Sequence, residues 1–568
     1  MFTMLFLSLQ ALIKPSKNKR LRNVIALCAL LTPIYALAND HFSSWSDKTI
    51  CRLAKATPDN VEYQAESTKR GLSCGVAVTT FSETSIPDDN KITDLTKALA
   101  VGGECTASDL YETTSELSEK KFSLFGSKVR DTKIPKYLKN TPGEITSDIG
   151  NVYPHIQLVD DFNNDGIDDL FIDYNSTLVA PLILYGQKSG SFKVLNLGSS
   201  NSNAPRKTIR KAVSADFNND GYLDIFGFTT GDHYQDKEVS ERELLLINQN
   251  GSTFKAVDVP EPRKNPPNHG GFVIDINNDG FTDIVSLDED EGFASYPLKN
   301  IDGKKFSLVK NGLNPDIKKY RIHDGDAADL NNDGFEDMVI SIHVPKKDKF
   351  KNKDNLRIIY GDSDFNFDKN KITKMGNSWL SKKRVTEISD DFDAEILSGT
   401  SNISLVDINA DGKIDILVGE YIDVFDWRTS GFKSYINMGN CFADQTSTYF
   451  PNQKANRKME TGNFTAFILV FDHADLNNDG YKDLILRNSM DETAYWETAK
   501  AEAFPYIFMN HNNEKYLPIA FRSLERLRDE KSLSVGDFNG DGLVDLVTIG
   551  NRFESNEITV RTFLLNPE

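Results

Sequence analysis

Cysteine is scarce in this sequence, and its spacing excludes the usual cysteine-ligated metal sites. Five of the 568 residues are cysteine, and no two of them form a C-x-x-C pair, which such sites commonly use. The signatures G-x-S-x-G, H-E-x-x-H and the glycine-rich phosphate loop are missing too. The sequence therefore carries none of the active-site motifs that mark nucleophile-elbow hydrolases, zinc proteases or phosphate-loop enzymes.

Positive charge is in the minority, and long apolar runs are almost absent. The chain has 65 Lys and Arg against 84 Asp and Glu, a formal charge of −19, which argues against nucleic acid as a partner. One apolar run, residues 24–38, follows Lys17, Lys19, Arg20 and Arg22 and ends in Ala-Leu-Ala. This pattern predicts a signal peptide over residues 1–38 and no transmembrane segment beyond it.

The signal peptide predicts an exported protein that is periplasmic, at the cell surface or secreted, with a mature chain from Asn39. The mature chain would carry a charge of −24, because the first 38 residues hold five basic and no acidic side chains. Four cysteines remain in it, an even number that suggests two disulfides among three connectivities. Cys51 with Cys74 and Cys105 with Cys441 is one of these. Residues 39–118 predict a small helical, cystine-containing module with a linker to residues 119–568.

One nine-residue motif dominates residues 119–568. The pattern D-x-N-x-D-G-x-x-D occurs seven times, and the copies start at Asp161, Asp216, Asp275, Asp329, Asp407, Asp475 and Asp537. The first six residues resemble an EF-hand calcium loop, but the bidentate Glu that an EF-hand needs at position 12 is missing. Position 12 is Ile172, Gly227, Ser286, Ile340, Val418, Leu486 or Thr548.

The spacing of the copies predicts the fold. Their first residues lie 55, 59, 54, 78, 68 and 62 apart, the length of a four-stranded antiparallel blade, and apolar β-prone segments flank every motif. We therefore predict an all-β, seven-bladed β-propeller. The last repeat ends before its fourth strand, and residues 120–125, "KKFSLF", resemble "KKFSLV" at 304–309 in the third repeat. Residues 120–125 are thus predicted to close the last blade.

These motifs and strands resemble the FG-GAP/VCBS repeat family, the calcium-loop propellers related to the head of integrin α subunits. The residue pattern itself places carboxylate or amide oxygens at positions 1, 3, 5 and 9 of each loop, and we predict up to seven structural Ca²⁺ ions. The alternative is that these side chains only cap turns. The predicted side-chain ligands are Asp161, Asn163, Asp165, Asp169, Asp216, Asn218, Asp220, Asp224, Asp275, Asn277, Asp279, Asp283, Asp329, Asn331, Asp333, Asp337, Asp407, Asn409, Asp411, Asp415, Asp475, Asn477, Asp479, Asp483, Asp537, Asn539, Asp541 and Asp545.

The resemblance implies a further calcium ligand, the backbone carbonyl at position 7, which is Ile167, Tyr222, Phe281, Phe335, Lys413, Tyr481 or Leu543. It also implies that the calcium loops share one face and that a ligand would bind the other. Two aromatic segments are expected to form long loops on that face. Their aromatic side chains would contact a ligand or, alternatively, pack within their own loops. The segments contain Tyr421, Phe425 and Trp427, and Tyr495 and Trp496.

Basic residues recur six positions before the loops, where a propeller would bring them to the mouth of its channel. They are His155, Arg210, His269, His323 and Lys531. These residues are candidates for catalysis. Alternatively, they have a packing role or form ion pairs with Asp324 or Asp326. The sequence thus predicts a calcium-binding module for a glycan or a cell-surface or envelope protein. The alternatives are a polysaccharide lyase that uses the basic residues and a structural envelope component.

Overall fold

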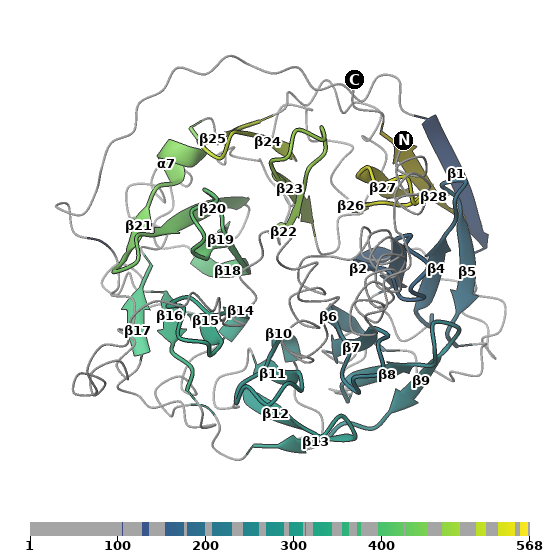
Figure 1. Ribbon diagram of the computed structural model, residues 1–568, viewed down its shortest axis with the longest axis horizontal. Helices are drawn as coiled ribbons and strands as arrows, with labels where there is room; N and C mark the ends of the chain where they lie inside the picture. Colours follow the sequence, from purple (N-terminus) through teal and green to yellow (C-terminus); the bar gives the residue numbers. More distant parts are fainter. Residues whose placement is uncertain are drawn as a thin grey trace, which may run out of the picture.

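The computed structural model has seven sheets arranged around a common centre (Figure 1), and each sheet has four strands. None of the helices among the described residues has the length and apolar content needed to span a bilayer. The structure describes residues 105, 128–135, 154–174, 179–198, 207–229, 242–260, 268–288, 295–309, 313, 322–342, 355–362, 372–376, 396–424, 427–451, 469–488, 507–518, 532–550 and 557–565.

The first four blades are each built from consecutive antiparallel strands. Blade 1 contains β2 (His155–Asp160), β3 (Asp169–Asp173), β4 (Leu182–Gly186) and β5 (Phe192–Asn196). Blade 2 contains β6 (Ile209–Ala215), β7 (Asp224–Thr229), β8 (Leu244–Asn248) and β9 (Phe254–Val257). Blade 3 contains β10 (Asn268–Ile274), β11 (Asp283–Asp288), β12 (Tyr296–Ile301) and β13 (Lys305–Leu308). Blade 4 contains β14 (Ile322–Ala328), β15 (Asp337–Ile342), β16 (Leu356–Ile359) and β17 (Ile372–Met375).

The last three blades follow the same order, except that the fourth strand of blade 7 comes from the other end of the chain. Blade 5 contains β18 (Ile396–Val406), β19 (Asp415–Val424), β20 (Trp427–Asn437) and β21 (Phe442–Asp444), followed by the short helix α7 (Thr446–Tyr449). Blade 6 contains β22 (Leu469–Ala474), β23 (Asp483–Asn488), β24 (Ile507–His511) and β25 (Lys515–Pro518). Blade 7 contains β26 (Ser532–Gly536), β27 (Asp545–Gly550), β28 (Glu557–Leu564) and β1 (Lys128–Pro135). This architecture confirms the predicted seven-bladed β-propeller.

The hydrophobic core lies between the blades. The second strands are mostly apolar after their first Asp, and β3, β7 and β15 are buried at every position, because a neighbouring blade covers each face of the sheet. Within the described residues, the core consists of seven clusters, and each joins two adjacent blades. The apolar side chains therefore fix how each blade packs on the next.

An N-terminal strand completes blade 7, but it is β1, which pairs with β28 from Lys128↔Leu564 to Pro135↔Glu557. The predicted segment 120–125 lies outside the described residues. The strand β1 begins three residues after the end of that segment. Ile134 of β1 is buried in the cluster between blades 7 and 1. Residues 128–131 are exposed, Thr132 is half-buried and Ile134 is buried, so the second half of the strand faces the core and fixes its register.

Blade 5 is longer than the others. The segment with Tyr421 and Trp427 was expected to be a long loop, but it continues β19 and β20, which pair up to Val424↔Trp427. The strands β18, β19 and β20 therefore extend away from the acidic loop by about five residues, or roughly 16 Å. We call the paired residues 396–400, 420–424 and 427–431 the fifth-blade extension.

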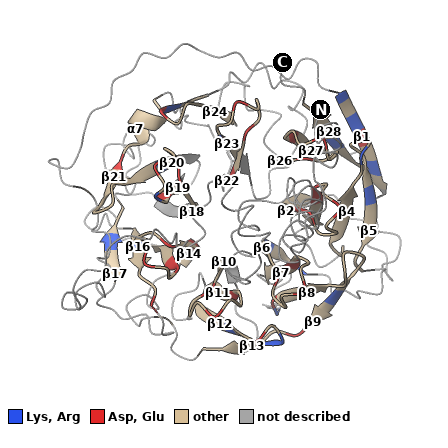
Figure 2. Cartoon of the chain, viewed as in Figure 1, with Lys and Arg blue, Asp and Glu red and all other residues tan. Residues whose placement is uncertain are grey.

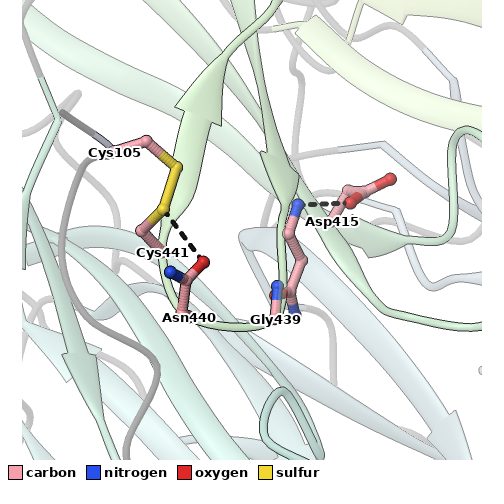
Figure 3. The surroundings of a disulfide bond; sticks show 6 residues. Cys105, Asp415, Gly439, Asn440 and Cys441 are labelled. Carbon is pink, nitrogen blue, oxygen red and sulfur yellow. Dashed lines mark hydrogen bonds between the residues drawn. A yellow bond between two sulfur atoms is a disulfide. The ribbon is translucent and has the colours of Figure 1, made fainter. Parts of the chain in front are cut away.

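A disulfide ties residue 105 to the same blade. Cys105 is bonded to Cys441, beside Gly439 and Asn440 (Figure 3), and the Cys105 amide donates to the Phe442 carbonyl of β21 at 2.8 Å. Cys51, Cys74 and the remainder of the predicted helical module, residues 39–118, lie outside the described residues. The disulfide thus fixes one point of the N-terminal region on the rim of blade 5.

Candidate functional site

The seven acidic loops, numbered 1 to 7 in chain order, share one backbone conformation. Position 4 has a positive φ of 53° to 72° in every loop, and the Gly at position 6 has a φ of 82° to 91°. Asn, which tolerates this left-handed conformation, occupies position 4 in five loops, whereas Ala410 and Gly540 occupy it in loops 5 and 7. The two left-handed residues therefore turn the chain sharply within each loop.

Side-chain oxygens hold this turn through backbone amides. In loop 1 the Asp161 carboxylate accepts from the amides of Asp165 and Gly166, at 3.1 and 2.8 Å, and Asp165 accepts from the amide of Ile167 at 3.0 Å. The same bonds from positions 5, 6 and 7 recur in the other six loops. The loop side chains therefore do cap turns, as the alternative interpretation required.

The acid at position 9 anchors the loop to its blade. Asp224 accepts from the amide of Phe217 in the loop at 3.0 Å and from the amide of Asn248 on β8 at 2.7 Å. The Asn248 side chain then donates to the Phe162 carbonyl of the preceding loop at 2.8 Å. All seven position-9 acids make the equivalent pair of bonds. The Asn side-chain bond to an earlier loop recurs from Asn300 to the Phe217 carbonyl and from Asn437 to the Leu330 carbonyl, which gives the Asn of these third strands a structural role.

These buried acids are electrostatically unfavourable without a cation. Burial raises the pKa of the position-9 carboxyl, and the neighbouring acids at positions 1 and 5 raise it further. The pKa is about 8 for Asp224, Asp283, Asp337 and Asp415, and about 7 for Asp483 and Asp545. A cation at the centre of a loop would favour the charged form of all three acids.

The donor set of the loops fits calcium in its chemistry, since every predicted ligand is an oxygen. In loop 3 the Asn277 Oδ1 atom is buried without a hydrogen-bond partner, which leaves a predicted ligand oxygen available. Among the described residues, no group of three or more His, Cys, Asp or Glu side chains is placed to hold a metal by itself. A cation in a loop would therefore depend on the amide and carbonyl oxygens as well as on the acids.

Neighbouring loops are bonded to one another. The position-4 side chains Asn164, Asn219 and Asn278 donate to the position-6 carbonyls of the next loops, Gly221, Gly280 and Gly334, at 2.8, 3.4 and 3.2 Å. The Glu336 carboxylate of loop 4 also accepts from the Asp275 amide of loop 3 at 2.7 Å. These contacts were not predicted from the sequence, although Asn recurs at position 4 in five of the seven repeats.

The basic residues before the loops lie at the starts of the innermost strands, around the centre of Figure 1. His155 begins β2, and Arg210, His269 and His323 lie in β6, β10 and β14, whereas Lys531 is outside the described residues. The first-strand pairing shifts register at Arg210, at His269 and at His323 with Asp324. These are β-bulges, which turn a side chain out of the regular alternation of a strand.

An ion pair crosses the inner strands one residue further along. The Lys211 Nζ atom lies 2.6 Å from the Asp324 carboxylate, which also accepts from Asn402 Nδ2 and the Ile403 amide at 2.9 and 2.8 Å. Asp324 thus joins blades 2, 4 and 5. Burial raises the pKa of Asp324, although the Lys211 charge opposes this. The partner of Asp324 is thus Lys211, the residue after Arg210, and not one of the five basic residues considered from the sequence.

The aromatic candidates are only partly described. Tyr421 lies in β19 opposite Ser430, and Trp427 begins β20 opposite Val424. Phe425, Tyr495 and Trp496 lie outside the described residues. The fifth-blade extension therefore carries Tyr421 and Trp427 on the side of the propeller opposite loop 5.

The FG-GAP-like repeat family matches residues 161–227 and 475–548, which run from acidic loop 1 into β7 of blade 2 and from acidic loop 6 into β27 of blade 7. No curated protein matches the chain. Among solved structures, rhamnogalacturonan lyase YesW is 12% identical with a TM-score of 0.34 over 73% of this chain and 72% of that one.

Two further solved structures resemble the chain to a similar degree. They are the Bacillus licheniformis rhamnogalacturonan lyase PL11, at 11% identity and a TM-score of 0.32 over 72% of this chain and 71% of that one, and the exotype rhamnogalacturonan lyase YesX, at 11% and 0.33 over 77% and 76%.

Proposed function

Because the chain folds FG-GAP-like repeats into a seven-bladed propeller, we propose that it is an exported calcium-binding module that holds a glycan or a protein partner. Calcium would be held by the acids at positions 1, 5 and 9, the Asn at position 3 and the carbonyl at position 7 of each loop. When bound, the ion would neutralise three neighbouring carboxylates. Its role is structural, because these residues lie in the turns that connect the first two strands of each blade.

The fifth-blade extension is the observation that supports a binding role. Partner sites commonly lie on segments that project from a rigid scaffold, and here three paired strands project on the side away from loop 5. They carry Tyr421 and Trp427, residue types that contribute strongly to binding sites. A sheet that projects in this way could hold a sugar chain or a protein segment without any change in the seven blades.

A shortened variant tests this proposal. Glu420 and Gly431 are directly paired, so Asn-Gly in place of residues 421–430 would close the hairpin with a two-residue turn. The calcium-loaded variant and the wild-type protein are co-sedimented with neutral and acidic polysaccharides and with isolated cell envelopes. Loss of binding with unchanged melting temperature supports the proposal, whereas equal binding by the variant excludes the extension as the site.

A second candidate function, a polysaccharide lyase, is supported by the bulges. Bulges occur next to active sites because they redirect single side chains, and here they fall on Arg210, His269 and His323. A neutral His could remove the proton beside a sugar carboxylate while the glycosidic C–O bond breaks. The test is the ultraviolet absorbance of unsaturated uronate products, with the wild-type protein and with His269→Ala and His323→Ala. No absorbance change with any acidic polysaccharide would exclude this function.

A further inference from the structure

Loops 1 to 4 are joined by a series of equivalent hydrogen bonds that the proposed calcium function does not require. Each bond runs from the Asn side chain at position 4 of one loop to the Gly carbonyl at position 6 of the next. Among the described residues, it is formed from loops 1, 2 and 3. We call these four loops the loop arc, with residues 161–169, 216–224, 275–283 and 329–337.

The donor of each bond lies between two predicted calcium ligands. Asn164 is flanked by Asn163 and Asp165, which occupy positions 3 and 5 of loop 1. An ion that holds both neighbours would fix the backbone of Asn164, whose positive φ of 57° already restricts it. The position of the Asn164 amide group therefore depends on whether loop 1 is ordered.

The acceptor of each bond belongs to a peptide unit that orients a ligand of the next loop. Asn164 donates to the Gly221 carbonyl at 2.8 Å. The amide of Tyr222, in the same planar peptide unit, donates to Asp220 Oδ1 at 3.0 Å. Because a peptide unit is rigid, fixing its carbonyl also fixes its N–H. Asp220 at position 5 of loop 2 is thereby oriented from loop 1.

The same connection is repeated along the arc. Asn219 holds the Gly280 carbonyl, and the following Phe281 amide donates to Asp279 at 3.1 Å. Asn278 holds the Gly334 carbonyl, and the Phe335 amide donates to Asp333 at 2.9 Å. Glu336 adds a bond in the opposite direction, to the Asp275 amide. Loops 3 and 4 are therefore connected twice.

From these contacts we infer that the loop arc binds calcium cooperatively, so that an ion in one loop raises the affinity of the next. The inference rests on the proposed calcium binding of the loops. It gives the Asn at position 4 a role in coupling sites rather than in ligation. Coupling between sites is reciprocal, so an ion in loop 2 raises the affinity of loop 1 by the same factor. Loop 5 lacks the donor, because Ala410 occupies position 4.

The test is a calcium titration of the metal-depleted full-length chain, measured by isothermal titration calorimetry. Asn219→Gly removes the central donor and keeps the backbone conformation, since Gly540 naturally occupies this position in loop 7. Asn478→Gly is the matched control in loop 6, where Asn478 has an equivalent φ of 53°. We expect wild type and control to bind with a Hill coefficient above 1. Asn219→Gly should weaken binding in the arc by about five- to tenfold, at the lower end of ordinary coupling between sites.

A gain-of-coupling variant guards against a folding defect. Ala410→Asn places the missing donor beside loop 6, where Gly480 is the equivalent acceptor position, and should add cooperativity. No calcium binding by wild type would overturn both the proposed metal function and this inference. Calcium binding without cooperativity, or equal Hill coefficients in wild type and Asn219→Gly, would overturn the inference alone.

Discussion

Lys211 and Asp324 form an ion pair of 2.6 Å between blades that are not neighbours. Lys211 lies on β6 of blade 2 and Asp324 on β14 of blade 4, so the Lys side chain passes the inner strand of blade 3. Gly270 of that strand occupies the position equivalent to Lys211 and Asp324, five residues before the acidic loop. This position of blade 3 therefore places no side chain between the two charged groups.

Lys211→Met is expected to destabilise the propeller by about 2–3 kcal/mol. Removal of the ammonium group leaves the Asp324 carboxylate, whose side chain is 4% exposed, buried without a counter-charge. The measurement is urea unfolding in calcium. The double variant Lys211→Met with Asp324→Asn should recover part of the loss, because it removes the buried charge as well. Equal stability of wild type and Lys211→Met would contradict the structural role of the pair.

Ala410→Gly should stabilise the chain by about 0.5–1 kcal/mol. Ala410 has a φ of +56°, and a non-glycine residue costs roughly 1–2 kcal/mol in this conformation, partly offset by the greater freedom of Gly in the unfolded chain. Gly412→Ala in the same loop is the opposite control. Gly412 has a φ of +82° and open space around its Cβ position, so backbone strain alone should lower the melting temperature of the Gly412→Ala variant.

Ile134→Ala in the closing strand is expected to cost about 2–4 kcal/mol, the range for a buried Ile. Ile134 is 1% exposed in the core between blades 7 and 1, whereas Val129 on the same strand is 37% exposed. Val129→Ala should therefore change stability by less than about 0.5 kcal/mol. Thermal unfolding of both variants measures the difference, and similar values would show that β1 does not hold the ring closed.

Calcium removal should lower the melting temperature strongly. At a free calcium concentration tenfold above the dissociation constant, each occupied loop adds about 1.4 kcal/mol to the free energy of unfolding. Several loops together would approach the whole stability of an ordinary domain. Differential scanning calorimetry with and without a chelator tests this, and magnesium is the control because it requires a more rigid octahedral site. An unchanged melting temperature would show that the loops are held by hydrogen bonds alone.

The metal-free protein should lose stability as the pH rises from about 4 to 8. Six of the seven position-9 acids, all except Asp169, have a pKa near 3.8 when unfolded and about 7 to 8 when folded, so the folded chain binds more protons across this range. The stabilisation from these protonated acids is complete below the unfolded pKa and is lost as the pH passes the folded pKa. Calcium competes with the protons, so its stabilising effect should be larger at pH 8 than at pH 5. A chelated protein that melts higher at pH 8 would contradict this.

The repeat spacing and the alternation of apolar residues were sufficient to predict the architecture. Seven copies of D-x-N-x-D-G-x-x-D, each between β-prone segments, correspond to seven loops that join the first and second strands. Local chemistry decides these features, since Asn and Gly at positions 4 and 6 favour the left-handed turn and the Asp side chains bond to amides within five residues. The incomplete last repeat also indicated that an N-terminal strand closes blade 7.

The contacts between distant parts of the chain required the tertiary structure. The closing strand that the structure describes is Lys128–Pro135, and the burial of Ile134 against blade 1 fixes its register. Arg210, His269 and His323 fall on irregularities of the strand pairing. Figure 2 shows that Lys and Arg, like Asp and Glu, are distributed over several blades. Lys211 with Asp324 and Asn164 with Gly221 are 113 and 57 residues apart. Sequence patterns determine each blade because its bonds are local, whereas the packing of seven blades in a ring decides which distant side chains meet.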